Sequence, residues 1–252
     1  MNMFRSFCII TLLSFVYFGC TSTQKVVVTE GHSNVEIPDS LYPSVNLQIE
    51  GHTPYTQKHY PERIAYFKKN PLQLKDVVFL GNSITEMGAD WGKRLEKPGI
   101  KNRGIGGDIS AGVLLRLGEI TFVKPSAVFL LIGINDINHT KLSAFQIASN
   151  IVEITKIIKC ESPKTKVFVQ TIFPSSAGNI KAKIAETNLW IKRKHQRKLF
   201  TIIDTHVLLR DENDLIKKEY TYDGIHLTET GYTAWVNKLK GYFADIKPGT
   251  DR

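Results

Sequence analysis

Cysteine is scarce in this sequence, with three residues in a chain of 252. A scaffold held together by several disulfides, as in small secreted domains, is therefore excluded. Internal repeats and low-complexity tracts are also lacking, so a repeat architecture is not indicated. The composition is ordinary for a globular protein, with 42% hydrophobic and 23% charged residues. Such a chain has enough apolar material to bury one substantial core, and we expect a single main domain.

Acidic residues are outnumbered by basic ones, 24 against 33, which gives a formal net charge of +9. A surplus of this sign favours nucleic acid, an anionic membrane surface or an acidic substrate. The chain has no basic arm with interleaved aromatics, which argues against nucleic acid as a partner. The densest basic run, residues 191–198, falls in an expected helix and is explained by a solvated helix face.

The N-terminus has the pattern of an export signal. Arg5 supplies a positive start and residues 7–18 supply a short apolar stretch, as signal peptides do. This stretch is too short for a membrane span, which takes about 20 residues. We expect residues 1–19 to be removed on export from a bacterial cytoplasm.

The cysteine at position 20 indicates that the export signal is also a lipidation signal. Because Cys20 follows a glycine, the segment resembles a bacterial lipoprotein signal, in which Cys20 is lipidated and anchors the protein to a membrane facing the periplasm or cell surface. Tyr17 and Phe18 depart from the usual residues before that cysteine, and plain secretion is the alternative. With Cys8 removed and Cys20 lipidated, Cys160 is expected to have no disulfide partner.

The rest of the chain divides into an arm and one larger domain. Residues 20–55 lack sustained periodicity and contain several glycines and prolines, which suits a tether and an arm lying on the domain. The domain is expected over residues 56–252. Its first helix is predicted to start at Pro61, a first-turn proline, and to stop at Asn70.

Apolar, β-branched runs alternate with amphipathic helices through the domain. The runs lie at residues 77–80, 127–132, 167–172 and 200–203, with a weaker strand near residue 100. Ser143 with Gln146 predicts a capping box before one helix, and Thr228 predicts a cap before the last. Strand and helix in alternation predict an α/β fold with a parallel sheet covered on both faces. Ligands of such sheets bind beyond the carboxyl ends of the strands.

Ser83 follows the first apolar run and has two interpretations. A serine at a strand-to-helix junction commonly caps the helix, but it also serves as a nucleophile when a base and its orienting group are nearby. His226 is the candidate base because Asp223 stands three residues before it, close enough to share one side of a turn. His139 competes for the role, although its polar surroundings favour a loop histidine.

Two further residues offer hydrogen-bond donors at strand ends. Gly107 lies in the glycine-rich turn "GIGGD", where a backbone N–H is open to a substrate oxygen, and Asn135 offers a side-chain amide after a central strand. Each also has a structural interpretation as a plain turn residue. We expect Asp108 to cap the following helix and Asp136 to stabilise a local turn.

Taken in order, the blocks "GNSIT", "GIGGD", "GIND" and "DGIH" resemble those of the SGNH, or GDSL-type, esterases and lipases. The segment "NRGIGGDISAGVLLRL" is similar to the platelet-activating-factor acetylhydrolase-like branch. Asn82 replaces the aspartate usual in the first block, and it keeps a short hydrogen-bonding side chain.

The resemblance implies a three-layer, flavodoxin-like fold with a five-stranded sheet in the order 2-1-3-4-5. It implies Ser83, Asp223 and His226 as the triad, and the Ser83 N–H, Gly107 N–H and Asn135 side chain as oxyanion donors, without metal or organic cofactor. The expected activity is hydrolysis of a carboxylic ester through an acyl-enzyme, with a short acyl group such as acetyl on a carbohydrate.

Other functions stay open at this point. A lysophospholipase or thioesterase would use the same site, and a non-catalytic glycan or lipid binder could share the fold. A nucleotide-binding domain fits poorly, because Ile109 stands where a dinucleotide-binding turn needs its third glycine.

Overall fold

The computed structural model describes residues 36–244 and 246. The expected signal segment, with Cys20, lies outside these residues, as does the first part of the expected tether. Export and lipidation therefore stay predictions from the sequence.

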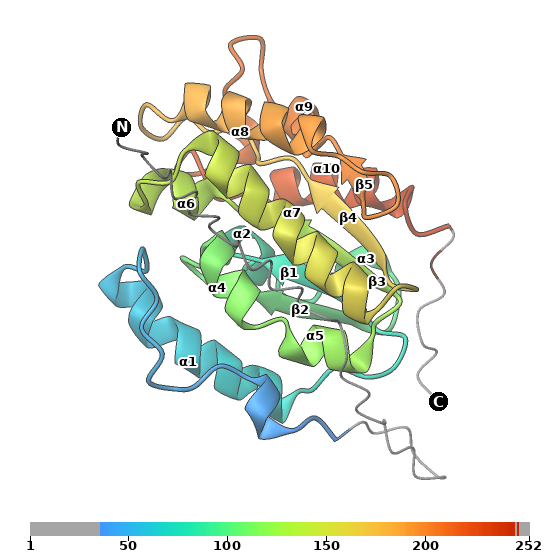
Figure 1. The fold of residues 1–252 in the computed structure, drawn as a ribbon. Helices are drawn as coiled ribbons and strands as arrows, with labels where there is room; N and C mark the ends of the chain where they lie inside the picture. Colours follow the sequence, from blue (N-terminus) through green and yellow to red (C-terminus); the bar gives the residue numbers. More distant parts are fainter. Residues whose placement is uncertain (1–35, 245, 247–252) are drawn as a thin grey trace, which may run out of the picture.

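Five parallel strands form one sheet in the order β2-β1-β3-β4-β5 (Figure 1). This arrangement confirms the predicted sheet and its strand order. The strands are β1 (Val77–Gly81), β2 (Ile100–Gly104), β3 (Ala127–Leu131), β4 (Lys166–Gln170) and β5 (Thr201–Ile203). Their carboxyl ends meet at one edge, and the loops that follow them carry the residues of interest.

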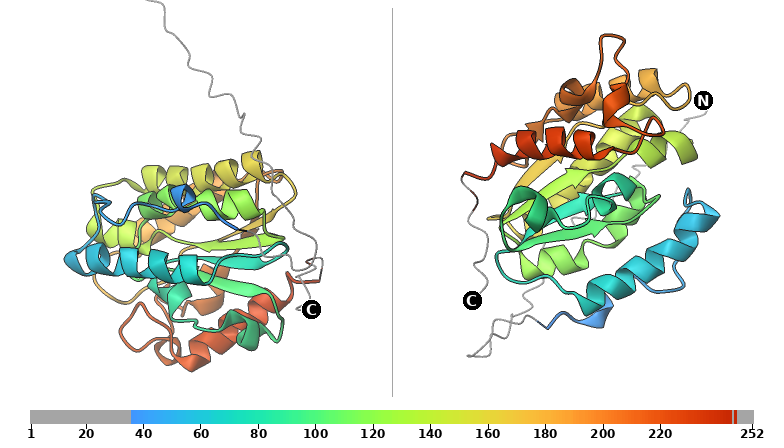
Figure 2. Two further views of the ribbon diagram at one scale, coloured as in Figure 1. Left: turned by 90° about the horizontal axis from the view of Figure 1, so that it is seen from below. Right: turned by 180° about the vertical axis from the view of Figure 1, so that it is seen from behind.

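Helices cover both faces of the sheet and make three layers (Figures 1 and 2). One layer holds α4 (Ser110–Leu115), α5 (Gly118–Val123), α7 (Ala144–Glu161) and α8 (Lys181–Arg193), and the other holds α2 (Ser83–Glu86), α3 (Trp91–Leu95), α9 (Thr205–Leu209) and α10 (Glu229–Lys240). Successive strand residues point to opposite layers. Val78 thus packs with the first layer, while Phe79 stacks on Trp91 of the second. Because both faces are covered, the central strands β1 and β3 are buried throughout.

Three further short elements occur in the described chain. These are η1 (Asp39–Leu41), α6 (Ile134–His139) and η2 (Lys218–Tyr220). Of them, α6 follows β3 at the carboxyl edge of the sheet, and η2 precedes the loop that leads into α10.

The first helix, α1 (Pro54–Lys69), lies beside the β2 edge of the sheet (Figures 1 and 2). Its N-cap is Thr53, whose side chain accepts the Thr56 N–H at 3.2 Å. The predicted start at Pro61 is therefore wrong, and Pro61 lies inside the helix. Both prolines suit a first turn, but only Pro54 has a capping threonine directly before it.

Two predicted caps are confirmed and one expectation about cysteine is not. Ser143 and Gln146 form the capping box of α7, and Thr228 caps α10. Cys160, in the last turn of α7, is disulfide-bonded. The expectation that it lacks a partner is wrong for the full chain, in which Cys8 and Cys20 are both present, because it assumed that the first is removed and the second is lipidated.

Neither a membrane-spanning helix nor a cluster of metal ligands occurs in the part of the chain that the structure describes. No helix there is long and apolar enough to cross a bilayer. No group of three or more His, Cys, Asp or Glu side chains there is placed to hold a metal ion.

Candidate active site

The end of β1 leads through Asn82 into α2, whose first residue is Ser83. Asn82 is the N-cap, and its side chain accepts the N–H of Ile84 at 3.1 Å. The capping role that the sequence left open for Ser83 thus belongs to Asn82. The Ser83 hydroxyl has a different partner, since its Oγ lies 2.9 Å from Nε2 of His226.

His226 comes from the loop between η2 and α10. Its Nδ1 lies 2.6 Å from Oδ2 of Asp223, and its backbone N–H donates to the other carboxylate oxygen at 2.7 Å. Because an ionised carboxylate only accepts, Nδ1 carries the hydrogen and Nε2 is left to accept from the Ser83 hydroxyl. His139 is exposed at the end of α6, so the structure places His226, and not His139, against Ser83.

The Asp223 carboxylate is ionised at neutral pH. Burial by itself would raise its pKa, but hydrogen bonds from the His226 side chain and from the N–H groups of His226 and Ile225 outweigh burial and hold the pKa below its ordinary value of 3.8. The ionised carboxylate fixes the orientation of the His226 ring through the hydrogen on Nδ1. Because the Asp223 and His226 side chains are 41% and 26% exposed, solvent screens part of the electrostatic attraction between them.

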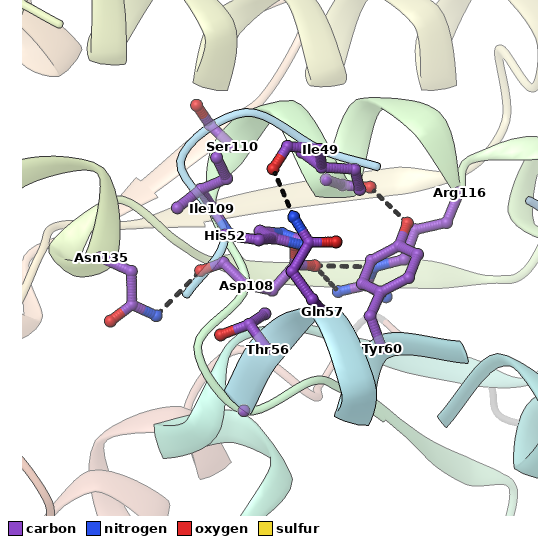
Figure 3. Close-up of polar contacts among 12 residues, drawn as sticks. Ile49, His52, Thr56, Gln57, Tyr60, Asp108, Ile109, Ser110, Arg116 and Asn135 are labelled. Carbon is purple, nitrogen blue, oxygen red and sulfur yellow. Dashed lines mark hydrogen bonds and ion pairs between the residues drawn. The ribbon is translucent and has the colours of Figure 1, made fainter. Parts of the chain in front are cut away.

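Three candidate oxyanion donors follow the strands β1, β2 and β3 at the carboxyl edge of the sheet. The N–H of Ser83 begins a helix, and the N–H of Gly107 lies in a turn with φ of +77°; neither has an acceptor among the described residues. Asn135, in the first turn of α6, donates from Nδ2 to the Asp108 carbonyl at 2.9 Å, which leaves its second amide hydrogen for a ligand (Figure 3). The structure therefore joins Ser83, His226 and Asp223 directly, and it places Gly107 and Asn135 at the same edge of the sheet, linked to each other through Asp108.

The roles expected for two aspartates are wrong. The N-cap of α4 is Ile109, and Asp108 instead forms an ion pair with Arg116, Nε to Oδ2 at 3.0 Å, and contacts His52 (Figure 3). Asp136 accepts the first N–H of α4, from Ser110 at 2.9 Å, together with the Ser110 hydroxyl. Burial raises the pKa of Asp136, and the Ser110 hydrogen bonds partly offset this. Capping of α4 thus comes from another loop, which local sequence rules do not consider.

Sequence reasoning missed several supporting residues. Glu86, at the end of α2, accepts the Gly106 N–H at 2.6 Å and contacts His59 at 3.0 Å and Arg63 at 3.2 Å, both from α1. It therefore joins the helix of Ser83 to the turn of Gly107. Arg116 was missed as well, although a lone arginine among leucines in "LLRL" is the signal of a buried ion pair.

A small and mostly apolar cavity is lined by residues that adjoin the candidate site residues in the sequence. Its lining includes Ile84, Ile134 and Ile225, which are the sequence neighbours of Ser83, Asn135 and His226 respectively. The cavity volume is about 10 Å³, on a scale where roughly 10–15 Å³ just admits a water molecule. Such a space accepts a group of about methyl size.

Two exposed tyrosines flank the same region. Tyr222 is 60% exposed, stacks on His226 with ring centroids 6.0 Å apart, and places its hydroxyl 3.9 Å from the sulfur of Met87. Tyr55 is 63% exposed and stacks on His59 at 5.2 Å. Their exposed aromatic faces are open to contact with a ligand.

Comparison with known proteins agrees with the fold and identifies the family. The sequence model of the GDSL-like Lipase/Acylhydrolase family matches residues 79–234. The alpha1 subunit of platelet-activating factor acetylhydrolase IB from Homo sapiens is 28% identical over 168 residues, which cover 63% of this chain and 71% of that protein. A GDSL-like lipase from Bacteroides thetaiotaomicron is 25% identical, with a TM-score of 0.62 over 74% of this chain and 96% of that chain.

A member of the lipolytic G-D-S-L family from Veillonella parvula shares the fold at 20% identity, with a TM-score of 0.56 over 68% of this chain and 99% of that chain. The matched residues 79–234 make up more than half of the 252 and include all five nominated site residues. The chain belongs to the GDSL-like lipase/acylhydrolase family and is a carboxylic ester hydrolase.

Proposed function

We propose that this enzyme hydrolyses short acyl esters through an acyl-enzyme formed on Ser83. The observation that carries the proposal is the 2.9 Å approach of Ser83 Oγ to His226 Nε2. The 2.6 Å contact of His226 Nδ1 with Asp223 orients the ring for that approach. A hydroxyl, a base and an orienting carboxylate in this relation are the constellation of a serine hydrolase.

The proposed reaction has two halves. In the first, Ser83 Oγ attacks the ester carbonyl carbon while His226 Nε2 takes the hydroxyl proton, and the alcohol then leaves with that proton. In the second, a water gives its proton to His226 and attacks the acyl carbon, and Ser83 departs as the free hydroxyl. The N–H groups of Ser83 and Gly107 and the Asn135 amide stabilise the oxyanion in both halves.

The cavity beside the triad supports a short acyl group. With room for about a methyl group next to Ile84, Ile134 and Ile225, it fits acetyl and opposes long acyl chains. The relatives that carry the name acetylhydrolase point the same way. A lysophospholipase acting on long acyl chains is therefore the less supported alternative.

The exposed tyrosines support a carbohydrate as the alcohol part of the ester. Tyr55 and Tyr222 offer flat apolar faces, and His59 and Glu86 add polar groups near the first of them. A sugar ring presents apolar C–H faces and peripheral hydroxyls, and both kinds of group have a counterpart here.

Hydrolysis of p-nitrophenyl acetate by purified protein tests the proposal. We expect turnover by the wild type, nearly complete loss in Ser83→Ala, and no change in Ser149→Ala, whose hydroxyl donates to the Phe145 carbonyl within α7. If Ser83→Ala keeps wild-type turnover, the proposed nucleophile is wrong. If the wild type binds acetylated glycans without hydrolysing any ester, it is a binding protein.

A further inference from the structure

Residues 49–69 lie outside the matched family region, yet they pack on the loop that carries Gly107. Ile49 and the α1 residues Tyr60, Ile64 and Phe67 form a buried cluster with Ile105 and Ile109, which flank the turn. The arm and α1 therefore pack on the loop that carries Gly107, and they add contacts that the matched family region, residues 79–234, does not contain.

Asp108 is the point where the arm meets the proposed oxyanion donors. It directly follows Gly107 in the chain, and its carbonyl accepts Nδ2 of Asn135 at 2.9 Å. A shift of Asp108 would thus move the Gly107 N–H through the chain and the Asn135 amide through its hydrogen bond. Two of the three donors depend on the placement of this one residue.

The Asp108 side chain is fully buried and contacts three hydrogen-bond donors, which are the side chains of Arg116 and His52 and the N–H of Ile109, 3.0 Å from Oδ1 (Figure 3). Arg116 pairs with Oδ2 at 3.0 Å and also donates to the Gly81 carbonyl at 2.9 Å, two residues before Ser83. His52, from the arm, lies with Nε2 3.1 Å from Oδ1, and its side chain is 1% exposed. Because the carboxylate accepts only, the ring must donate from Nε2.

Thr56, in the first turn of α1, packs against the loop that carries Gly107. It is fully buried, and a Cβ added at Gly107 would lie 2.0 Å from its Oγ1. The start of α1 is therefore in direct contact with the backbone of the donor residue. The arm holds the turn through both a hydrogen bond and packing.

We propose that His52 is a positioning residue of the oxyanion hole, which acts through Asp108 to hold Gly107 and Asn135 in place. The inference rests on the proposed function, since it assigns a purpose to donors that serve an oxyanion. Residues 49–60 then help to position the oxyanion donors and are more than a linker before the domain.

Three substitutions at one position test the inference. A glutamine amide reaches the position of His Nε2 and an asparagine amide reaches that of Nδ1, so His52→Gln keeps the donor to Asp108 while His52→Asn and His52→Ala remove it. We expect kcat for p-nitrophenyl acetate to fall about 10- to 100-fold in His52→Asn and His52→Ala, with KM within about twofold, because a donor misplaced by about 1 Å costs up to about 10²-fold. His52→Gln should stay within about fivefold of the wild type.

Affinity for 1,1,1-trifluoroacetone separates positioning from a general loss of stability. Its carbonyl carbon bonds to Ser83 Oγ, the carbonyl oxygen becomes an oxyanion, and the hydroxyl proton passes to His226, so the adduct needs the oxyanion donors. We expect its inhibition constant to weaken in parallel with kcat. Ile158→Ala, near the end of α7 and fully buried, is the control for destabilisation alone and should leave kcat and this constant unchanged.

The outcomes distinguish the two levels of the proposal. Equal kcat and equal trifluoroacetone affinity in His52→Gln and His52→Asn would overturn the role of His52 while Ser83-dependent hydrolysis stands. This comparison holds even if His52→Ala does not fold. A wild type without Ser83-dependent hydrolysis would remove the proposed function, and the inference with it.

Discussion

Replacement of Gly107 by alanine tests the oxyanion loop most sharply. The residue has φ of +77°, and an added Cβ would lie 2.0 Å from Oγ1 of Thr56 and 3.1 Å from its Cβ. The first distance is shorter than any real contact, so the loop or α1 must shift. Since Thr56 is fully buried on a helix, we expect the loop with its N–H donor to move.

The expected magnitudes follow from two separate effects. An L-residue in the left-handed region costs roughly 1–2 kcal/mol of folding free energy. Displacement of one oxyanion donor costs about 10²- to 10³-fold in kcat. Gly178→Ala is a matched control, because Gly178 has φ of +64° with nothing within 4 Å of an added Cβ. It should show the strain without the loss of rate.

The assay is p-nitrophenyl acetate turnover together with thermal unfolding. In Gly107→Ala combined with Thr56→Ala, the nearest remaining Thr56 atom is Cβ at 3.1 Å, so part of the lost kcat should return while the backbone strain remains. A Gly107→Ala variant with wild-type kcat would refute the reasoning, and so would a rate loss of equal size in Gly178→Ala.

Further variants probe the donor, the acyl cavity and the carboxylate. Asn135→Ala should lower kcat by about 10²- to 10³-fold with the fold intact by circular dichroism, and unchanged turnover would deny it an oxyanion role. Ile225→Ala enlarges the cavity, so the rate ratio of p-nitrophenyl butyrate to acetate should rise roughly tenfold; a constant ratio would mean that the acyl group lies elsewhere. Because the pKa of Asp223 is held below 3.8, the stabilisation from its carboxylate is complete above that pH and is lost as the pH falls through the lowered value. The Tm difference between wild type and Asp223→Asn should accordingly be constant at higher pH and shrink in more acidic buffer, and a difference that grows instead would reverse the sign of the argument.

The sequence predicted the sheet and the residues at its carboxyl edge. Each buried strand carried a continuous apolar run, and parallel strands bring the residues after those runs to one place. Ser83, Gly107 and Asn135 could therefore be nominated together. Asp223 and His226 were found because their partnership spans only three residues.

Local sequence patterns could not predict the contacts between segments that lie far apart in the chain. His52 and Asp108 are 56 residues apart, and Asp136 binds the start of a helix 26 residues earlier in the chain. Local rules assigned both aspartates to their nearest turn or helix, since a capping preference takes no account of a buried partner from another loop. The start of α1 was missed for a related reason, because two prolines met the same first-turn rule.

The most direct measurement is the site of covalent labelling by a serine-reactive phosphonate, mapped by peptide mass spectrometry. The account predicts a single modified residue, Ser83. It also predicts a labelling rate that falls steeply in His226→Ala, because without this base nothing takes the proton of the Ser83 hydroxyl. Labelling of another residue, or an equal rate without the imidazole, would contradict it.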